Sequence, residues 1–145
     1  MHSTDCLLCH TPGGTVLWQN EQLRVIDACD ALYPGFTRVI WTAHVVEMTD
    51  LSVIEQSELL RIVMLVEKVQ RAELKPDKVN LAAFGNVVPH LHWHVIPRFE
   101  NDQHFPNSHW GEAMRDIHTT LLDENSKKTL KEKLATLVAC ALTAS

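Results

Sequence analysis

Residues 90–96, HLHWHVI, alternate strictly between histidine and apolar side chains, and this pattern constrains the fold more than any other in the chain. Side chains two apart point to the same face of a β-strand, so a strand would gather all the histidines on one face. A helix would give them no common face. A proline flanks the run on each side, and Trp, Val and Ile favour strands. We therefore predict a strand with its apolar face in the core and its histidines lining a surface or a cleft. The histidines are His90, His92 and His94, and the apolar set is Leu91, Trp93 and Val95.

Three imidazoles this close together indicate a functional site. A single histidine on a strand is ordinarily a half-exposed polar residue. Three neighbours, however, oppose one another's protonation unless an anion or a metal ion compensates. Imidazole has an unperturbed pKa of about 6.5, close to neutrality. The pattern therefore indicates a metal site, phosphate chemistry, or both.

Composition limits the classes of protein to consider. The 145 residues suffice for one domain with a sizeable core. A net charge of −5 gives no general attraction for nucleic acid, so local groups must hold any anionic ligand. No apolar run approaches the roughly 20 residues of a membrane span, and the N-terminal MHSTDCLLCH lacks the basic and apolar parts of a signal peptide. We expect a cytoplasmic protein that binds neither nucleic acid nor a membrane.

The four cysteines fall into two groups. Without a secretory signal, two disulfides are the weaker interpretation. Cys29 and Cys140 have apolar neighbours and are predicted to be small core residues. Cys6 and Cys9 form a C-x-x-C pair, which is half of a structural zinc site, but a redox pair or incidental spacing explains it equally well. A zinc site needs two more ligands.

Turn signals and hydrophobic periodicity divide the rest of the chain. Strands are predicted at 13–20, 23–28, 37–41 and 78–85, ahead of the histidine strand. Ser52 and Glu55 form a capping box for a long helix, which should stop before Pro76. This order predicts an α+β fold, in which a five-stranded antiparallel meander sheet carries a long central helix and a C-terminal helix. The helices are predicted at 52–74, 113–122 and 126–142.

The segment 100–111, ENDQHFPNSHWG, is polar, rich in turn residues and long for a loop in a compact domain. It nevertheless holds His104, Phe105, His109 and Trp110. These side chains could simply pack onto the domain surface, as amphipathic aromatics often do. Alternatively, the loop caps a ligand site next to the histidine strand. The sequence leaves both interpretations open.

The stretch HLHWHVI fits the His-φ-His-φ-His-φ-φ signature of the histidine triad (HIT) family, where φ is apolar. PGFTRVIWTAHV resembles the family's strand that ends in a histidine, and DLS followed by EL resembles the start of its central helix. NLAAFGNVVPHLHWHVIPR is similar to its run into the triad, so the resemblance covers about residues 6–99. The loop DQHFPNSHWG resembles a bacterial branch labelled HIT-family hydrolase or diadenosine-polyphosphate hydrolase. A single HIT domain over 1–145 is implied, with a zinc-knuckle-like segment at 1–12, an active-site loop at 100–111 and C-terminal helices at 113–142.

The resemblance implies nucleotide chemistry at the α-phosphate. The middle histidine, His92, would form a covalent nucleotidyl intermediate that is then hydrolysed or transferred. For attack, one ring nitrogen of His92 must be unprotonated, so the other should donate to a fixed acceptor such as a backbone carbonyl. His94 would bind the phosphate oxygens. Asn86 stands where many members have a Gln, and Val87 stands where members commonly have Ser or Thr, so a hydroxyl near the leaving group is absent.

Further nucleotide contacts follow from the same resemblance. Asn80 lies near the position of another amide on the phosphate or leaving-group side. Asp27 or Asp30 would bind the ribose, although either could be an ordinary turn residue and spacing does not choose between them. In the loop, His104 or His109 would assist the leaving group and Trp110 would stack on a base or close the site.

The resemblance also completes the zinc site. In zinc-bearing members the metal takes the C-x-x-C pair, the histidine before the long helix and the first triad histidine. These residues are Cys6, Cys9, His44 and His90. A Cys₂His₂ set is closed and therefore structural. The family further implies a homodimer and a nucleotide as the small-molecule substrate.

Two alternatives to a hydrolase or nucleotidyl transferase stay open. A nucleotide-binding regulator with little turnover would carry the same motifs. A tri-His metalloenzyme would instead bind one metal ion through His90, His92 and His94.

Overall fold

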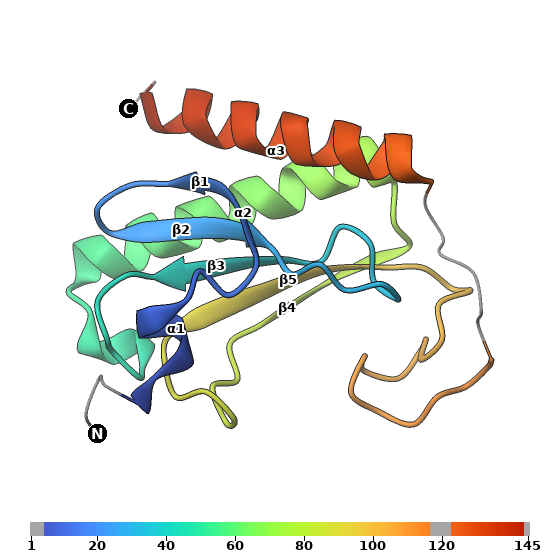
Figure 1. Cartoon of the computed structure of the whole chain (residues 1–145), viewed down its shortest axis with the longest axis horizontal. Coiled ribbons are helices and arrows are strands. Elements are labelled where there is room, and N and C mark those ends of the chain that lie inside the picture. Colours follow the sequence, from blue (N-terminus) through green and yellow to red (C-terminus); the bar gives the residue numbers. More distant parts are fainter. Residues whose placement is uncertain (1–4, 117–122, 144–145) are drawn as a thin grey trace.

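The computed structural model describes residues 5–116 and 123–143, in which a five-stranded sheet carries helices α2 and α3 on one face (Figure 1). The predicted α+β class, with its antiparallel sheet, long helix and C-terminal helix, is confirmed. The strands are β1 (Thr15–Gln19), β2 (Leu23–Asp27), β3 (Thr37–Trp41), β4 (Lys78–Ala82) and β5 (His92–Arg98). The helices are α1 (Leu7–His10), α2 (Val53–Leu74) and α3 (Glu124–Thr143), with a 3-10 turn at Met48–Asp50.

The strand order is β1-β2-β3-β5-β4, and every neighbouring pair is antiparallel. The first three strands follow one another as a meander, and β5 then lies between β3 and β4. The histidine strand begins two residues later than predicted and continues through Pro97. Proline fits there because β3 pairs only with His92–Val95, so no β3 residue lies opposite Pro97 and needs its missing amide hydrogen.

Helix α2 forms where the capping box predicts it. The Ser52 side chain accepts from the Glu55 amide, and the Glu55 carboxylate accepts from the Ser52 amide in return. The helix ends at Lys75, whose φ of +48° is left-handed. Its apolar stripe packs with α3 on the sheet in the main core. That stripe is Leu59, Ile62, Val63, Val66 and Val69. No helix among the described residues has both the length and the apolar character to cross a membrane.

The alternation in β5 divides its side chains as predicted. Leu91 and Val95 are buried in the core under the helices, with Trp93 packed against it. His92 and His94 lie on the opposite face, but they are only 8% and 3% exposed. Two segments cover this face: α1 with its flanking residues at one end, and the loop after β5 at the other (Figure 1). The histidines therefore line a covered cavity rather than an open surface.

Two predictions are wrong in part. The segment 113–116 is not helical, because the amides of Met114 and Arg115 bond to the Gln103 carbonyl and so hold it against the preceding loop. The remainder of the predicted helix, 117–122, lies outside the described residues. Cys29 and Cys140 are exposed instead of buried. Cys29 follows β2 in a turn with a φ of 56°.

Candidate functional site

The ring of His92 is fixed by its own strand. Its Nδ1 lies 2.5 Å from the carbonyl oxygen of His90. A carbonyl can only accept, so Nδ1 carries the proton and Nε2 carries the free lone pair. Burial, helped by the charge of Arg38, lowers the pKa of His92, while the hydrogen bond to His90 acts the other way. A neutral imidazole with an available Nε2 is the form that can attack an electrophile.

His94 is the next residue on the same face, with its ring centroid 4.9 Å from that of His92. Burial, together with His92, Arg38 and His109, lowers the pKa of His94 to about 3. Its Nδ1 is buried and has no hydrogen-bond partner. The neutral ring can offer one N–H to a ligand, and the unpartnered nitrogen indicates that a polar group belongs beside it.

Both rings line a cavity of about 430 Å³. The loop between β4 and β5 contributes Asn86 and Val87 to the lining and turns at Gly85, whose φ is +68°. Val87 is 93% exposed, so this wall presents a methyl surface where a hydroxyl would be expected. The full lining is Leu7, Leu8, Gly13, Arg38, Phe84, Gly85, Asn86, Val87, Val88, His92, His94 and Trp110.

Arg38 is a member of this site that the sequence analysis missed. It pairs with His94 across β3 and β5, so the sheet pleat places it on the histidine face. Its guanidinium lies 5.0 Å from the centroid of the Phe36 ring. The sequence did contain one indication. Arg38 is the only charged residue in the strand 37–41, and it lies two residues before Ile40, which faces the same side of the sheet.

A cluster of two thiols and two imidazoles lies next to the cavity. The ligand atoms of Cys6, Cys9, His44 and His90 all fall within 4.8 Å of one another. The sulfur–Nδ1 distances are 3.4 Å for Cys6–His90, 3.3 Å for Cys9–His44 and 3.5 Å for Cys9–His90. The Nε2 of His90 lies 2.6 Å from the carbonyl oxygen of Trp41 and donates to it, which leaves Nδ1 as the lone pair facing the sulfurs. The four residues predicted as metal ligands are thus brought together.

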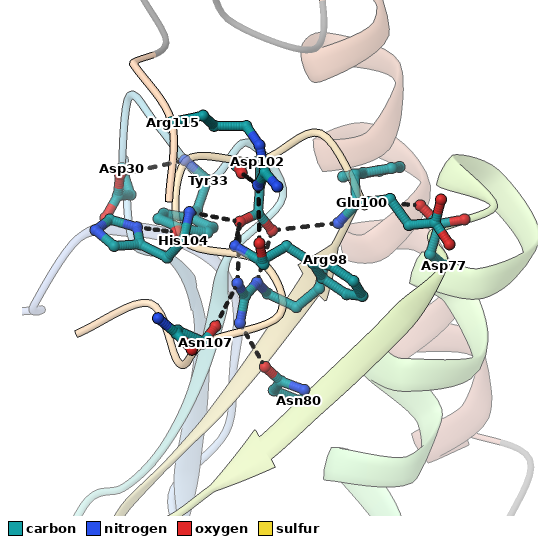
Figure 2. A network of polar contacts seen from close by, with 12 residues as sticks. Asp30, Tyr33, Asp77, Asn80, Arg98, Glu100, Asp102, His104, Asn107 and Arg115 are labelled. Carbon is teal, nitrogen blue, oxygen red and sulfur yellow. Dashed lines mark hydrogen bonds and ion pairs between the residues drawn. The ribbon is translucent and has the colours of Figure 1, made fainter. Parts of the chain in front are cut away.

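The loop after β5 is held by a buried ion pair (Figure 2). Arg98 and Asp102 are 2% and 1% exposed and form two parallel bonds, Nε–Oδ2 at 2.7 Å and Nη2–Oδ1 at 2.9 Å. Asp102 also accepts from the amides of His104 and Phe105. Burial alone would raise the pKa of Asp102, but these hydrogen bonds and the Arg98 charge lower it below its usual value. The pair fixes the path of a segment that has no regular secondary structure.

The far end of this loop reaches the cavity. Trp110 lines it, with ring centroids 5.2 Å from His94 and 4.4 Å from Phe84. His109 lies behind Trp110, 3.9 Å away, and also contacts Tyr33 and Phe36. His104, by contrast, hydrogen-bonds through Nδ1 to the Tyr33 hydroxyl and does not line the cavity (Figure 2).

None of the remaining predicted nucleotide contacts, Asp27, Asp30 and Asn80, is among the described residues that line the cavity. Asp27 is on the helix face, where its carboxylate forms an ion pair with Lys131 of α3 at 2.8 Å. Asp30 caps a turn through the amides of Leu32 and Tyr33. Burial lowers the pKa of Arg38, and the charge of Asp30 opposes this shift. Asn80 accepts from Arg98 at 2.8 Å and is absent from the cavity lining.

Known proteins resemble this chain in both sequence and fold. The HIT domain family matches residues 13–101. A bis(5'-adenosyl)-triphosphatase of Saccharomyces cerevisiae is 31% identical over 75 residues, which are 48% of this chain and 36% of the yeast enzyme. The chain thus spans little more than a third of that relative's length.

Two solved structures share the fold. A histidine triad protein from Bradyrhizobium japonicum has a TM-score of 0.74 at 26% identity, over 95% of this chain and 96% of that one. A zinc-bound histidine triad family protein from Mycobacterium smegmatis has a TM-score of 0.65 at 23% identity, over 96% and 99%. Because the family match covers more than half of the chain and includes the three alternating histidines, this protein belongs to the HIT domain family.

Proposed function

We propose that this protein is a nucleotide hydrolase or nucleotidyl transferase that cleaves a nucleoside polyphosphate or other nucleotide conjugate at the α-phosphate, through a covalent bond to His92. One observation carries the proposal: the Nδ1 of His92 is committed to the His90 carbonyl, which leaves a neutral Nε2 at the cavity. Membership of the HIT family and the distant yeast triphosphatase support the reaction class.

In the proposed reaction Nε2 of His92 attacks the α-phosphorus, the bond to the leaving group breaks, and a nucleotidyl-histidine forms. Water, or another acceptor, then displaces the nucleotide and releases the imidazole. Two displacements replace a single harder one. His94 would donate its one N–H to a non-bridging oxygen, since its low pKa keeps it neutral at pH 7. Asn86 would supply an amide on the other wall.

For the nucleoside we propose contacts with Trp110 and Asp30. Trp110 offers a half-exposed ring on which a base can stack. Asp30 is the better candidate for the ribose hydroxyls, because Asp27 is turned to the helix face and paired with Lys131. Val87 favours a leaving group that does not need a hydroxyl donor from this wall.

We further propose a structural zinc ion held by Cys6, Cys9, His44 and His90. A tetrahedral ion with Zn–S of about 2.3 Å and Zn–N of about 2.0–2.1 Å requires sulfur–nitrogen separations of about 3.6 Å. The three short distances in the cluster, 3.3–3.5 Å, are close to that separation. A zinc ion bound there would hold the N-terminal segment against His90, two residues before the nucleophile.

The tri-His metalloenzyme is less consistent with the geometry. Nδ1 of His90 faces the sulfurs, and Nδ1 of His92 is bonded to a carbonyl. Within the described part of the chain, the only group placed to hold a metal ion is the Cys₂His₂ cluster. The regulator shares every motif with the enzyme, so turnover must separate the two. The homodimer and the cytoplasmic location stay predictions.

The test is His92→Ala, with the exposed His10→Ala as the control, on a panel of adenine and guanine nucleotide conjugates. We expect mononucleotide release by the wild type and by His10→Ala, and none by His92→Ala, which should still fold and bind a mononucleotide. Wild-type protein denatured during turnover should carry the mass of one nucleotidyl group. Near-normal turnover in His92→Ala would rule out the mechanism. Binding without turnover in the wild type would favour the regulator.

A further inference from the structure

Three arginines project from the histidine face of the sheet, one from each of the strands β2, β3 and β5. Two of them hold the segments that cover this face. Arg24 donates to the carbonyl oxygens of Leu8, Thr11 and Pro12 at 2.7–3.2 Å. Arg98 donates to Asp102, Asn80 and Asn107 at 2.7–2.9 Å. Both guanidinium groups therefore form several short hydrogen bonds within the fold.

Arg38 differs from both. Its only hydrogen bond among the described residues runs from Nη1 to the Gly13 carbonyl oxygen at 3.5 Å, the limit of such a bond. Its Nε is buried and has no partner. No carboxylate in residues 5–116 or 123–143 forms an ion pair with it. A buried donor without a partner costs free energy, and a cationic donor costs more.

The surroundings of Arg38 explain why this cost persists. Arg38 is the only charged side chain among the described residues that line the cavity, and it lies opposite His94. The chain carries a net charge of −5 and has no glycine-rich phosphate loop. The cavity offers an anion two neutral imidazoles, the Asn86 amide and this one cation. A guanidinium also matches two phosphate oxygens at once.

We propose that Arg38 is a phosphate-binding residue of this site, and that its free donors take the non-bridging oxygens of the phosphate group that His92 attacks. This inference rests on the proposed function and adds a residue to it. Phe84, Val87 and Trp110 line the same cavity, so the site offers a cationic group for the phosphate and an apolar surface for the rest of the substrate. The preferred ligand is thus an anionic phosphate ester with an apolar or aromatic part.

The role of Arg38 can be tested by measuring the binding of mononucleotides, which does not require turnover. Calorimetry compares AMP and GMP with adenosine, guanosine and inorganic phosphate on the wild type and on Arg38→Met. The control is Arg71→Met, which removes one charge from the exposed side of α2. We expect Arg38→Met to weaken mononucleotide and phosphate binding by about 10- to 100-fold, as for lost charge-assisted hydrogen bonds, with nucleoside binding unchanged. Arg71→Met should change neither. Arg38→Gln, which keeps polarity but loses the charge, should give the same loss.

Melting of the ligand-free proteins is the second measurement. Because Arg38 has so few partners in the fold, Arg38→Met should melt at or above the wild-type temperature, whereas a structural arginine would make it melt lower. A mononucleotide should raise the melting temperature of the wild type more than that of the variant. Failure of Arg38→Met to fold, or equal weakening of mononucleotide and nucleoside binding, would overturn the proposal. Either result would leave the role of His92 untouched, because that role is measured by turnover.

Discussion

The two segments that cover the histidine face are held there by different chemistry. Residues 5–13 contribute the thiols of Cys6 and Cys9, which contact the imidazoles of His44 and His90. Within the cluster these side chains hold one another only through weak sulfur–imidazole hydrogen bonds. The loop 99–116 attaches at Arg98 through Asp102, a cation and an anion that satisfy each other. The first cover would gain a stronger anchor from the proposed zinc ion, and the second is complete in itself.

Because the attachments differ, each covering segment should be destabilised by a different change. The cavity lies between them, with Leu7, Leu8 and Gly13 contributed by the first and Trp110 by the second. A change in metal supply should loosen one wall and leave the other in place. Breaking the ion pair should do the reverse.

The largest effect is expected from the metal cluster. Protein purified without chelator should contain about one zinc ion per chain, and Cys6→Ser should contain far less, because three ligands hold zinc poorly. Loss of an ion that is present at about 1,000 times its Kd removes about 4 kcal/mol of stability. Hydrogen exchange should speed up in peptides from residues 5–13 and much less in those from 99–116.

The exposed Cys29→Ser is the control for this experiment and should keep both metal and stability. Zinc-free wild-type protein with freely alkylated Cys6 and Cys9 would contradict the zinc proposal. Full metal content in Cys6→Ser would instead point to the triad as the metal site.

The ion pair should give the next largest effect. Asp102→Asn leaves Arg98 buried without a counter-charge, and breaking such a pair from one side costs about 3 kcal/mol. Glu132→Gln is a matched control, since Lys128–Glu132 is also spaced i, i+4 but is exposed, and it should cost less than about 0.5 kcal/mol. Chemical denaturation measures both. If the two variants lose the same stability, the ion pair does not hold the loop.

The two covers also differ in how far the sequence predicted them. Alternating histidines and a capping box are local patterns, and the strand and α2 follow from them. The C-x-x-C pair is also local, but its two histidine partners were predicted only from the resemblance to the HIT family. The Arg98–Asp102 pair has no such signature, because its two residues are spaced as on a helix but lie at a strand end and in a loop. Arg38 was missed for a related reason. Arg38 is notable because its guanidinium has few hydrogen-bond partners, and this can be seen only in the folded structure.

Spacing alone also could not choose between Asp27 and Asp30. They are three residues apart, yet Asp27 still follows the pleat of β2 to the helix face, while Asp30 lies beyond the strand in a turn. The helix predicted at 113–122 illustrates the opposite error. Its first residues have adequate helix propensity, but Gln103 engages their amides from the preceding loop. Tertiary hydrogen bonds outweighed a weak local preference.

A smaller effect, on catalysis rather than stability, is expected at the tip of the loop. Trp110 is 54% exposed and packs against the rings of His94 and Phe84, so it supports little of the core. Trp110→Ala should lower kcat/KM for a nucleotide substrate about tenfold, as for the loss of one stacking contact, and leave the melting temperature nearly unchanged. His104→Ala, in the same loop but bonded to Tyr33, is the control. An unchanged kcat/KM in Trp110→Ala would show that Trp110 has no role in the site.

The smallest effect concerns pH and acts through His109, which packs behind Trp110. Burial, with the charges of Arg98, His104 and Arg38, lowers the pKa of His109 to about 4, although Asp30 opposes this. In the unfolded chain the pKa is about 6.5. Its influence on stability is therefore absent above about pH 6.5. Between there and about pH 4 the unfolded chain binds the proton first, and the folded protein loses stability as the pH falls.

His109→Gln removes this proton-binding group while both covers keep their anchors. Between pH 7 and pH 5.5 the variant should lose about 1 kcal/mol less stability than the wild type, measured by denaturation at each pH. The metal cluster and His94 also respond to acid, but they are common to both proteins and cancel in the difference. Asp102 does not titrate in this window, because its pKa is lowered and its contribution falls only below about pH 4. Parallel stability curves for the two proteins would mean that His109 is protonated as easily when folded as when unfolded, and that the loop does not shield it from water.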